Sequence, residues 1–166
     1  FFAADHFVPP ATSERADILR RYLDFIRAEG ISEDHLFEGI SHQLMVEDRR
    51  CRPEAVIAGA DSHTTMAGAL GCFAAGFGST DILGLLATGH VWVQIPEAIE
   101  VRFTGHLRPH VTGKDVALEM MRQLGEGGAG YRSIEFYDED QALTMASRMT
   151  LTNMAVDCGA KNGLFF

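Results

Sequence analysis

Four places in the 166-residue sequence carry imidazole or carboxylate groups that could act as acids or bases. They are Asp5-His6, His42, the run Asp61-Ser62-His63, and Asp157. A carboxylate beside an imidazole fixes which ring nitrogen holds the proton and raises the basicity of the ring. A general acid that works near neutral pH needs this arrangement. The residue types therefore indicate proton transfer to or from a small molecule.

Each position also has an ordinary structural interpretation. Neighbouring side chains in an extended segment point to opposite faces, so Asp5-His6 alone is better explained as a loop carboxylate and a surface histidine. Taken singly, His42 and Asp157 are better explained as hydrogen-bonded structural residues. The run 61–65 is stronger, because five polar residues follow an apolar stretch directly. A polar loop with a helix N-cap explains that run about equally well.

Metal and phosphate chemistry receive less support. His6, His42, Asp61 and His63 are suitable ligands for zinc, manganese or iron, but their spacing matches no known metal knuckle. The glycine-rich stretch 68–80 lacks the Lys-Ser/Thr ending of a P-loop and the spacing of a dinucleotide fingerprint. We therefore interpret these glycines as sites of close backbone packing.

The three cysteines, Cys51, Cys72 and Cys158, are odd in number and unequally spaced. This pattern fits neither a disulfide framework nor a C-x-x-C knuckle, and it predicts a reducing, cytoplasmic location. Free cysteines are usually small buried residues, which is how we interpret these three, although Cys158 adjoins Asp157. No metal ligand is expected among them.

The composition is that of a soluble globular protein. Hydrophobic residues make up 46% of the sequence and charged residues 22%, and the formal net charge is −9. An acidic surface of this kind argues against nucleic acid as a partner. It would not attract a carboxylate substrate either, so local donors would have to hold one. No stretch has the length of a secretory signal or a membrane span, and we expect no membrane contact.

The elements that must position these residues alternate between helix and strand. Helical spacing is predicted over 13–29, 80–89, 114–124 and 144–158, and strands over 55–59, 99–104 and 133–137. Residues 1–4 are predicted to be the inner end of a buried strand, which places Asp5-His6 at its end. The alternation predicts an α/β fold with a mainly parallel sheet flanked by helices. Two lobes are expected, 1–98 and 99–166.

Read together, the motifs resemble the aconitase superfamily, in order and in approximate spacing. They resemble the large subunits of 3-isopropylmalate dehydratase and homoaconitase more than the single-chain citrate enzymes, and the resemblance covers essentially the whole chain. The segments that carry it are Asp5-His6-Phe7-Val8-Pro9-Pro10, Ser41-His42-Gln43, Gly59-Ala60-Asp61-Ser62-His63-Thr64-Thr65, Gly68-Ala69-Leu70-Gly71, Gly78-Ser79-Thr80-Asp81, Leu86-Ala87-Thr88-Gly89, Ile134-Glu135-Phe136 and Thr152-Asn153-Met154-Ala155.

The resemblance implies a hydro-lyase that reversibly dehydrates and rehydrates a hydroxy di- or tricarboxylate, such as isopropylmalate or homocitrate. In this family an exposed iron of a [4Fe–4S] cluster binds the substrate hydroxyl and a carboxylate. By the resemblance, His6 paired with Asp5 protonates the departing hydroxyl. His42 and Asp61 form a second imidazole–carboxylate pair.

The remaining implied site residues are Ser62, which contacts substrate, Asn153, a polar group near the cluster, and a third pair, His63 with Asp157. The family usually has Glu where this sequence has Asp157. A carboxylate shorter by one methylene reaches His63 only after local adjustment or through water.

The resemblance also implies that essential parts are missing from this segment. The cluster cysteines and the substrate-binding arginines are expected downstream, and a serine base is expected on a swivelling domain or a separate small subunit. We therefore expect a large-subunit fragment that binds no cluster and is inactive by itself. Two alternatives stay open, a cluster-free metal-dependent hydrolase or lyase, and a non-catalytic interaction module that retains the fold.

Overall fold

The computed structural model describes residues 1–32, 35–48 and 50–166, and the chain forms two compact units. The units are Phe1–Asp48 and Arg49–Phe166. The lobe boundary was predicted between residues 98 and 99, which falls inside strand β3 (Ala98–Phe103). As a division into lobes of a complete enzyme it stays a prediction.

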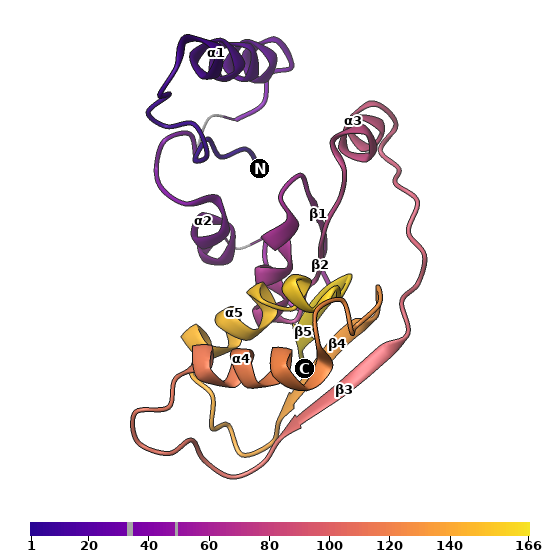
Figure 1. Ribbon diagram of the computed structural model, residues 1–166. Helices are drawn as coiled ribbons and strands as arrows, with labels where there is room; N and C mark the ends of the chain where they lie inside the picture. The colour runs from indigo at the N-terminus through magenta and orange to yellow at the C-terminus, as the bar shows by residue number, and fades with distance from the viewer. Residues whose placement is uncertain (33–34, 49) are drawn as a thin grey trace. The chain divides into compact units, whose positions relative to one another are not determined.

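The N-terminal unit contains helices α1 (Ser13–Ala28) and α2 (Ser41–Glu47) (Figure 1). Helix α1 matches the predicted helix. Thr12 is its N-cap, since the Thr12 hydroxyl accepts the Arg15 N–H. The predicted strand at 1–4 is wrong. These residues have no strand pairing and pack against α1, where the Phe2 ring lies 5.7 Å from the Tyr22 ring.

The larger unit contains two small parallel sheets. In the first, β1 (Val56–Gly59) pairs with β2 (Phe73–Gly76), with Gly59 opposite Gly76. In the second, β4 (Ser133–Asp138) lies between β3 (Ala98–Phe103) and β5 (Asn162–Phe165). All of these strand pairs are parallel. The predicted α/β fold with parallel strands is confirmed.

Helices connect and flank these strands. They are the 3₁₀ helix η1 (Ser62–Leu70), α3 (Ser79–Thr88), α4 (Gly113–Leu124), α5 (Met145–Asn153) and the 3₁₀ turn η2 (Val156–Cys158). Helix α5 lies beside α4 in Figure 1 and also contacts η1 and β5.

The helix predicted over 144–158 is correct only in its first part, because α5 ends at Asn153. The chain must reverse to begin β5 at Asn162, and Gly159 makes that turn with a φ of +77°. A continuous helix would carry the chain away from the sheet.

The core lies between the three-stranded sheet and helices α4 and α5. Phe136 and Phe165 are buried and their rings stack with centroids 4.8 Å apart. Helix η1 approaches β5 so closely that a Cβ at Gly68 would lie 1.8 Å from the carbonyl oxygen of Gly163. The prediction that this glycine serves close packing is confirmed.

Among the described residues, no helix combines the length and apolar composition that crossing a lipid bilayer requires.

Candidate functional site

The predicted acid–base residues lie in two groups, one in each unit. We call Asp5, His6, Ser41 and His42 the N-terminal group. We call Asp61, Ser62, His63, Asn153 and Asp157 the C-terminal group. Because His42 and Asp61 belong to different units, the second imidazole–carboxylate pair stays a prediction.

The tightest contact in the N-terminal group joins Asp5 and His6. The His6 Nδ1 atom lies 2.6 Å from the Asp5 Oδ1 atom, the distance of a charge-assisted hydrogen bond. The Asp5 side chain is only 13% exposed, whereas His6 is 62% exposed. The carboxylate is thus held inside while the imidazole faces outward, where a small molecule can reach it.

Asp5 also binds the start of α2. The backbone N–H of Ser41 donates to the Asp5 Oδ2 atom over 2.7 Å, and the Ser41 hydroxyl lies 2.9 Å from the Nδ1 atom of His42. Burial alone would raise the pKa of the Asp5 carboxyl, but hydrogen bonds from Ser41 and His6 lower that pKa below its ordinary value. Asp5 is therefore ionised at neutral pH.

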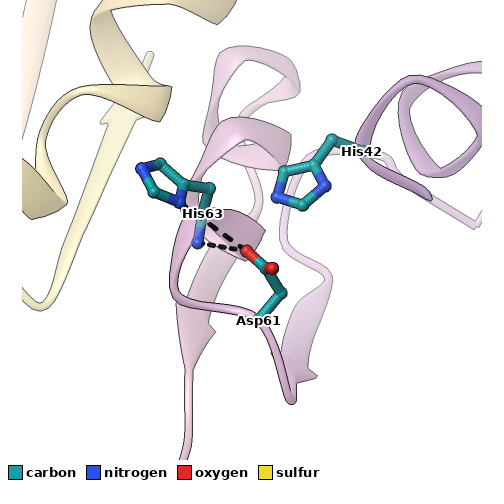
Figure 2. Close-up of side chains that lie close together, drawn as sticks. All are labelled: His42, Asp61 and His63. Atoms are coloured by element: carbon teal, nitrogen blue, oxygen red, sulfur yellow. Dashed lines mark hydrogen bonds and ion pairs between the residues drawn. The ribbon is translucent and has the colours of Figure 1, made fainter. Parts of the chain in front are cut away.

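The C-terminal group begins where β1 ends. Asp61 is the N-cap of η1, and its Oδ1 atom accepts the backbone N–H of His63 over 2.7 Å. The same carboxylate lies 3.7 Å from the Nδ1 atom of His63 (Figure 2), and the Ser62 hydroxyl lies 3.1 Å from that nitrogen. The polar run follows β1 as predicted, although this strand is exposed or half-buried rather than buried. The run is both an N-cap and a cluster of acid–base groups.

The third predicted pair is longer than the first. The Nε2 atom of His63 lies 3.9 Å from the Asp157 Oδ1 atom, too far for a direct hydrogen bond. Asn153 lies at the end of α5, and its amide approaches the Met66 sulfur at 3.8 Å. A hydrogen bond from Thr65 to the Asn153 carbonyl helps to hold α5 against η1.

Two contributors were not anticipated from the sequence, Ser41 and Lys161. The Lys161 ammonium donates to the Gly76 carbonyl over 2.9 Å and lies 3.9 Å from the Phe77 ring centroid. Burial lowers its pKa. Lys161 also lines a pocket of about 390 Å³ with Ser62, Phe77 and Tyr131. Lys161 lies outside every motif recognised in the sequence. Ser41 lies in the Ser41-His42-Gln43 motif, but its contact with Asp5 does not follow from that motif.

The contact between the Gly76 backbone and the Asp61-Ser62 motif is close. A Cβ at Gly76 would lie 2.8 Å from both the Asp61 carbonyl oxygen and the Ser62 Cα atom. The end of β2 therefore packs directly against the motif, and Lys161 binds the carbonyl of that last strand residue.

The cysteines of this chain do not fit an iron–sulfur cluster. Cys51, Cys72 and Cys158 are all buried, and burial raises the pKa of the Cys72 and Cys158 thiols. A cluster requires thiolates that reach a common point. Cys72 instead donates to the Arg52 carbonyl, and Cys158 packs in the hydrophobic core.

Comparison with known proteins decides the family. The model described as Aconitase family (aconitate hydratase) matches residues 10–166. The chain belongs to the aconitase family. The resemblance predicted from the ordered motifs is confirmed, and the α/β fold agrees with it.

Curated members of the aconitase family match along nearly the whole chain. The large subunit 1 of 3-isopropylmalate dehydratase from Deinococcus radiodurans is 41% identical over 96% of this chain and 37% of its own length. A probable methanogen homoaconitase large subunit from Methanothermobacter thermautotrophicus is 44% identical over 96% of this chain and 38% of its own.

The 3-isopropylmalate dehydratase large subunit from Thermoanaerobacter pseudethanolicus is 44% identical over 97% of this chain and 39% of its own length. The chain therefore spans less than two fifths of the curated aconitase-family relatives that it matches.

Proposed function

We propose that this chain is a segment of the large subunit of an aconitase-family hydro-lyase. The reaction is the reversible dehydration and rehydration of a hydroxy di- or tricarboxylate, such as isopropylmalate or homocitrate. The observation that carries the proposal is the contact between Asp5 and His6, at 2.6 Å, in a chain whose family match covers residues 10–166. The names of the relatives support this substrate class.

His6 is the proton donor to the departing hydroxyl in this proposal. Its Nδ1 atom is occupied by Asp5, so Nε2 is the atom that delivers the proton. The Asp5 carboxylate stabilises the protonated ring before transfer and keeps the ring oriented afterwards. The exposure of His6 supports this role, because a proton donor must reach its substrate.

The other groups handle protons and orientation around the same substrate. His42 with Asp61 forms the second pair, and His63 with Asp157 forms the third. Ser62 holds a substrate oxygen, supported by its position in the pocket lined by Lys161. Asn153 is a polar neighbour of the cluster.

The complete enzyme carries a [4Fe–4S] cluster that supplies Lewis acidity toward the substrate hydroxyl. Because the three cysteines of this chain are buried thiols, the cluster ligands lie outside these residues. We also propose that the complete enzyme binds a separate small subunit and is located in the cytoplasm. Relatives that are named large subunits support the partner.

The experiment uses the full-length large subunit with its small subunit, prepared without oxygen. Isopropylmalate and homocitrate are each supplied, and the unsaturated acid is followed by its ultraviolet absorbance. Turnover of one of these acids, and its loss when iron is removed, is expected. An enzyme with an intact cluster that dehydrates neither acid would contradict the proposal, and turnover by a cluster-free zinc or manganese form would favour a metal-dependent hydrolase or lyase.

A further inference from the structure

The Asp5 carboxylate accepts hydrogen bonds from His6 and from Ser41, the residue before His42. Asp5 Oδ1 meets His6 Nδ1 at 2.6 Å, and Asp5 Oδ2 accepts the Ser41 N–H at 2.7 Å. The Ser41 hydroxyl then meets His42 Nδ1 at 2.9 Å. The Ser41 side chain also hydrogen-bonds to Asp5, so its hydroxyl links the Asp5-His6 pair to the imidazole of His42.

The Ser41 hydroxyl has one proton and can donate it to only one partner at a time. Whether that partner is Asp5 or His42 decides whether the Nδ1 atom of His42 is a donor or an acceptor. If the hydroxyl donates to His42, the Nδ1 atom of His42 is an acceptor. If the hydroxyl donates to Asp5, its oxygen accepts a hydrogen bond from the Nδ1–H group of His42. The second arrangement, in which the hydroxyl donates to Asp5, is favoured, because a hydrogen bond to a carboxylate is roughly twice as strong as one between neutral groups. The hydrogen bond that the Ser41 side chain makes to Asp5 agrees with it.

We infer that Ser41 is a positioning residue that connects Asp5 to His42, so that a single carboxylate holds a proton on the Nδ1 atom of both imidazoles. The Nε2 atom of each ring is then the one that exchanges protons. This inference rests on the proposed function only for its effect on turnover. The proton positions themselves can be tested without any reaction.

The substitution Ser41→Ala isolates the hydroxyl. The bond from the Ser41 backbone to Asp5 survives this change, so α2 keeps its capping contact and the variant is expected to fold. Ser41→Thr restores a hydroxyl at the same atom and is the matched control.

The proton positions are read from long-range ¹H–¹⁵N spectra of the histidine rings in the cluster-free full-length subunit. In the wild type, Nδ1 is expected to be protonated in both His6 and His42. In Ser41→Ala, the Nδ1 proton of His42 is lost in favour of Nε2, while the His6 ring is unchanged. Ser41→Thr returns His42 to the wild-type pattern.

Kinetics of the holoenzyme complete the test. Ser41→Ala is expected to lower kcat about 3- to 10-fold, the size of one lost hydrogen bond, with KM within about twofold of the wild type. An unchanged His42 spectrum in Ser41→Ala would overturn the inference, and so would a shifted spectrum with unchanged kcat. Failure of the proposed function would appear differently, as an enzyme that dehydrates no hydroxy acid while the His42 spectrum still responds to Ser41.

Discussion

The first and third imidazole–carboxylate pairs differ in how their partners are brought together. Asp5 and His6 are adjacent in the sequence and meet at 2.6 Å, whereas His63 and Asp157 come from distant elements and lie 3.9 Å apart. The first carboxylate is only 13% exposed and is bound by two segments, whereas the other is 42% exposed. A pair made by sequence neighbours is close enough for a direct hydrogen bond, and the distant Ser41 then holds its carboxylate. A pair made by tertiary packing depends on the length of its side chains.

The largest effect is expected from removing the imidazole of the Asp5-His6 pair. In the complete enzyme, His6→Ala is expected to lower kcat by roughly 10²- to 10⁴-fold with little change in KM, because proton delivery contributes to the transition state. Steady-state kinetics measure both. The control is His106→Ala, which removes an exposed histidine of the other unit and should leave kcat unchanged. Equal effects of the two substitutions would remove His6 from the mechanism.

Neutralising the Asp5 carboxylate tests whether the Asp5-His6 pair needs its negative charge. Asp5→Asn keeps an acceptor oxygen but loses the charge-assisted bonds to His6 and Ser41, so kcat should fall about 10- to 100-fold. Asp17→Asn, on the exposed surface of α1, is the matched control. A variant with wild-type kcat would show that adjacency alone orients His6.

The same substitution has a pH signature in stability. The pKa of Asp5 is lowered in the folded state, so its stabilising contribution is present above the unfolded value near 3.8 and disappears as the pH falls through the folded pKa. Denaturation of wild type and Asp5→Asn should therefore differ at neutral pH and converge below about pH 3.8. A difference that persists in stronger acid would contradict this sign.

The C-terminal group can be disturbed through its backbone support. Gly76→Ala places a methyl group 2.8 Å from the Asp61 carbonyl and the Ser62 Cα atom, so the motif must shift. Overpacking of this kind costs about 1–3 kcal/mol of unfolding free energy, measured by chemical denaturation. Gly84→Ala in α3 is the control, because no atom lies within 4 Å of its new methyl group. Equal stability of the two variants would mean that the end of β2 does not constrain the motif.

The smallest effect is expected from lengthening the carboxylate side chain of the His63-Asp157 pair. Asp157→Glu adds one methylene, enough to close the 3.9 Å gap to His63 Nε2. Turnover should be unchanged or rise by up to about threefold, since the new contact adds one hydrogen bond. A clear loss of kcat would mean that the surroundings have adapted to the shorter aspartate.

The elements that local residue patterns specify were predictable, and those that depend on distant partners were not. Helix α1 carries its own cap in Thr12, and β1 ends in a polar run whose Asp61 caps η1. Helix α2 has no side-chain cap of its own, because its start is bound by Asp5 from far along the chain.

Strand β5 was missed for the same reason. It begins with Asn162 and Gly163, which disfavour strands, and it forms because β4 pairs with it. The family motifs identified the acid–base residues. The contacts of Ser41 with Asp5 and of Lys161 with the Gly76 carbonyl do not follow from any local sequence pattern.

The central claim is that His6, oriented by Asp5, protonates the leaving hydroxyl. The most direct measurement compares wild type and His6→Ala on the hydroxy acid and on its chloro analogue, whose chloride leaves without a proton. The account predicts a roughly 10²- to 10⁴-fold loss on the hydroxy acid and a loss of no more than about threefold on the chloro analogue. Equal losses on both compounds would contradict it.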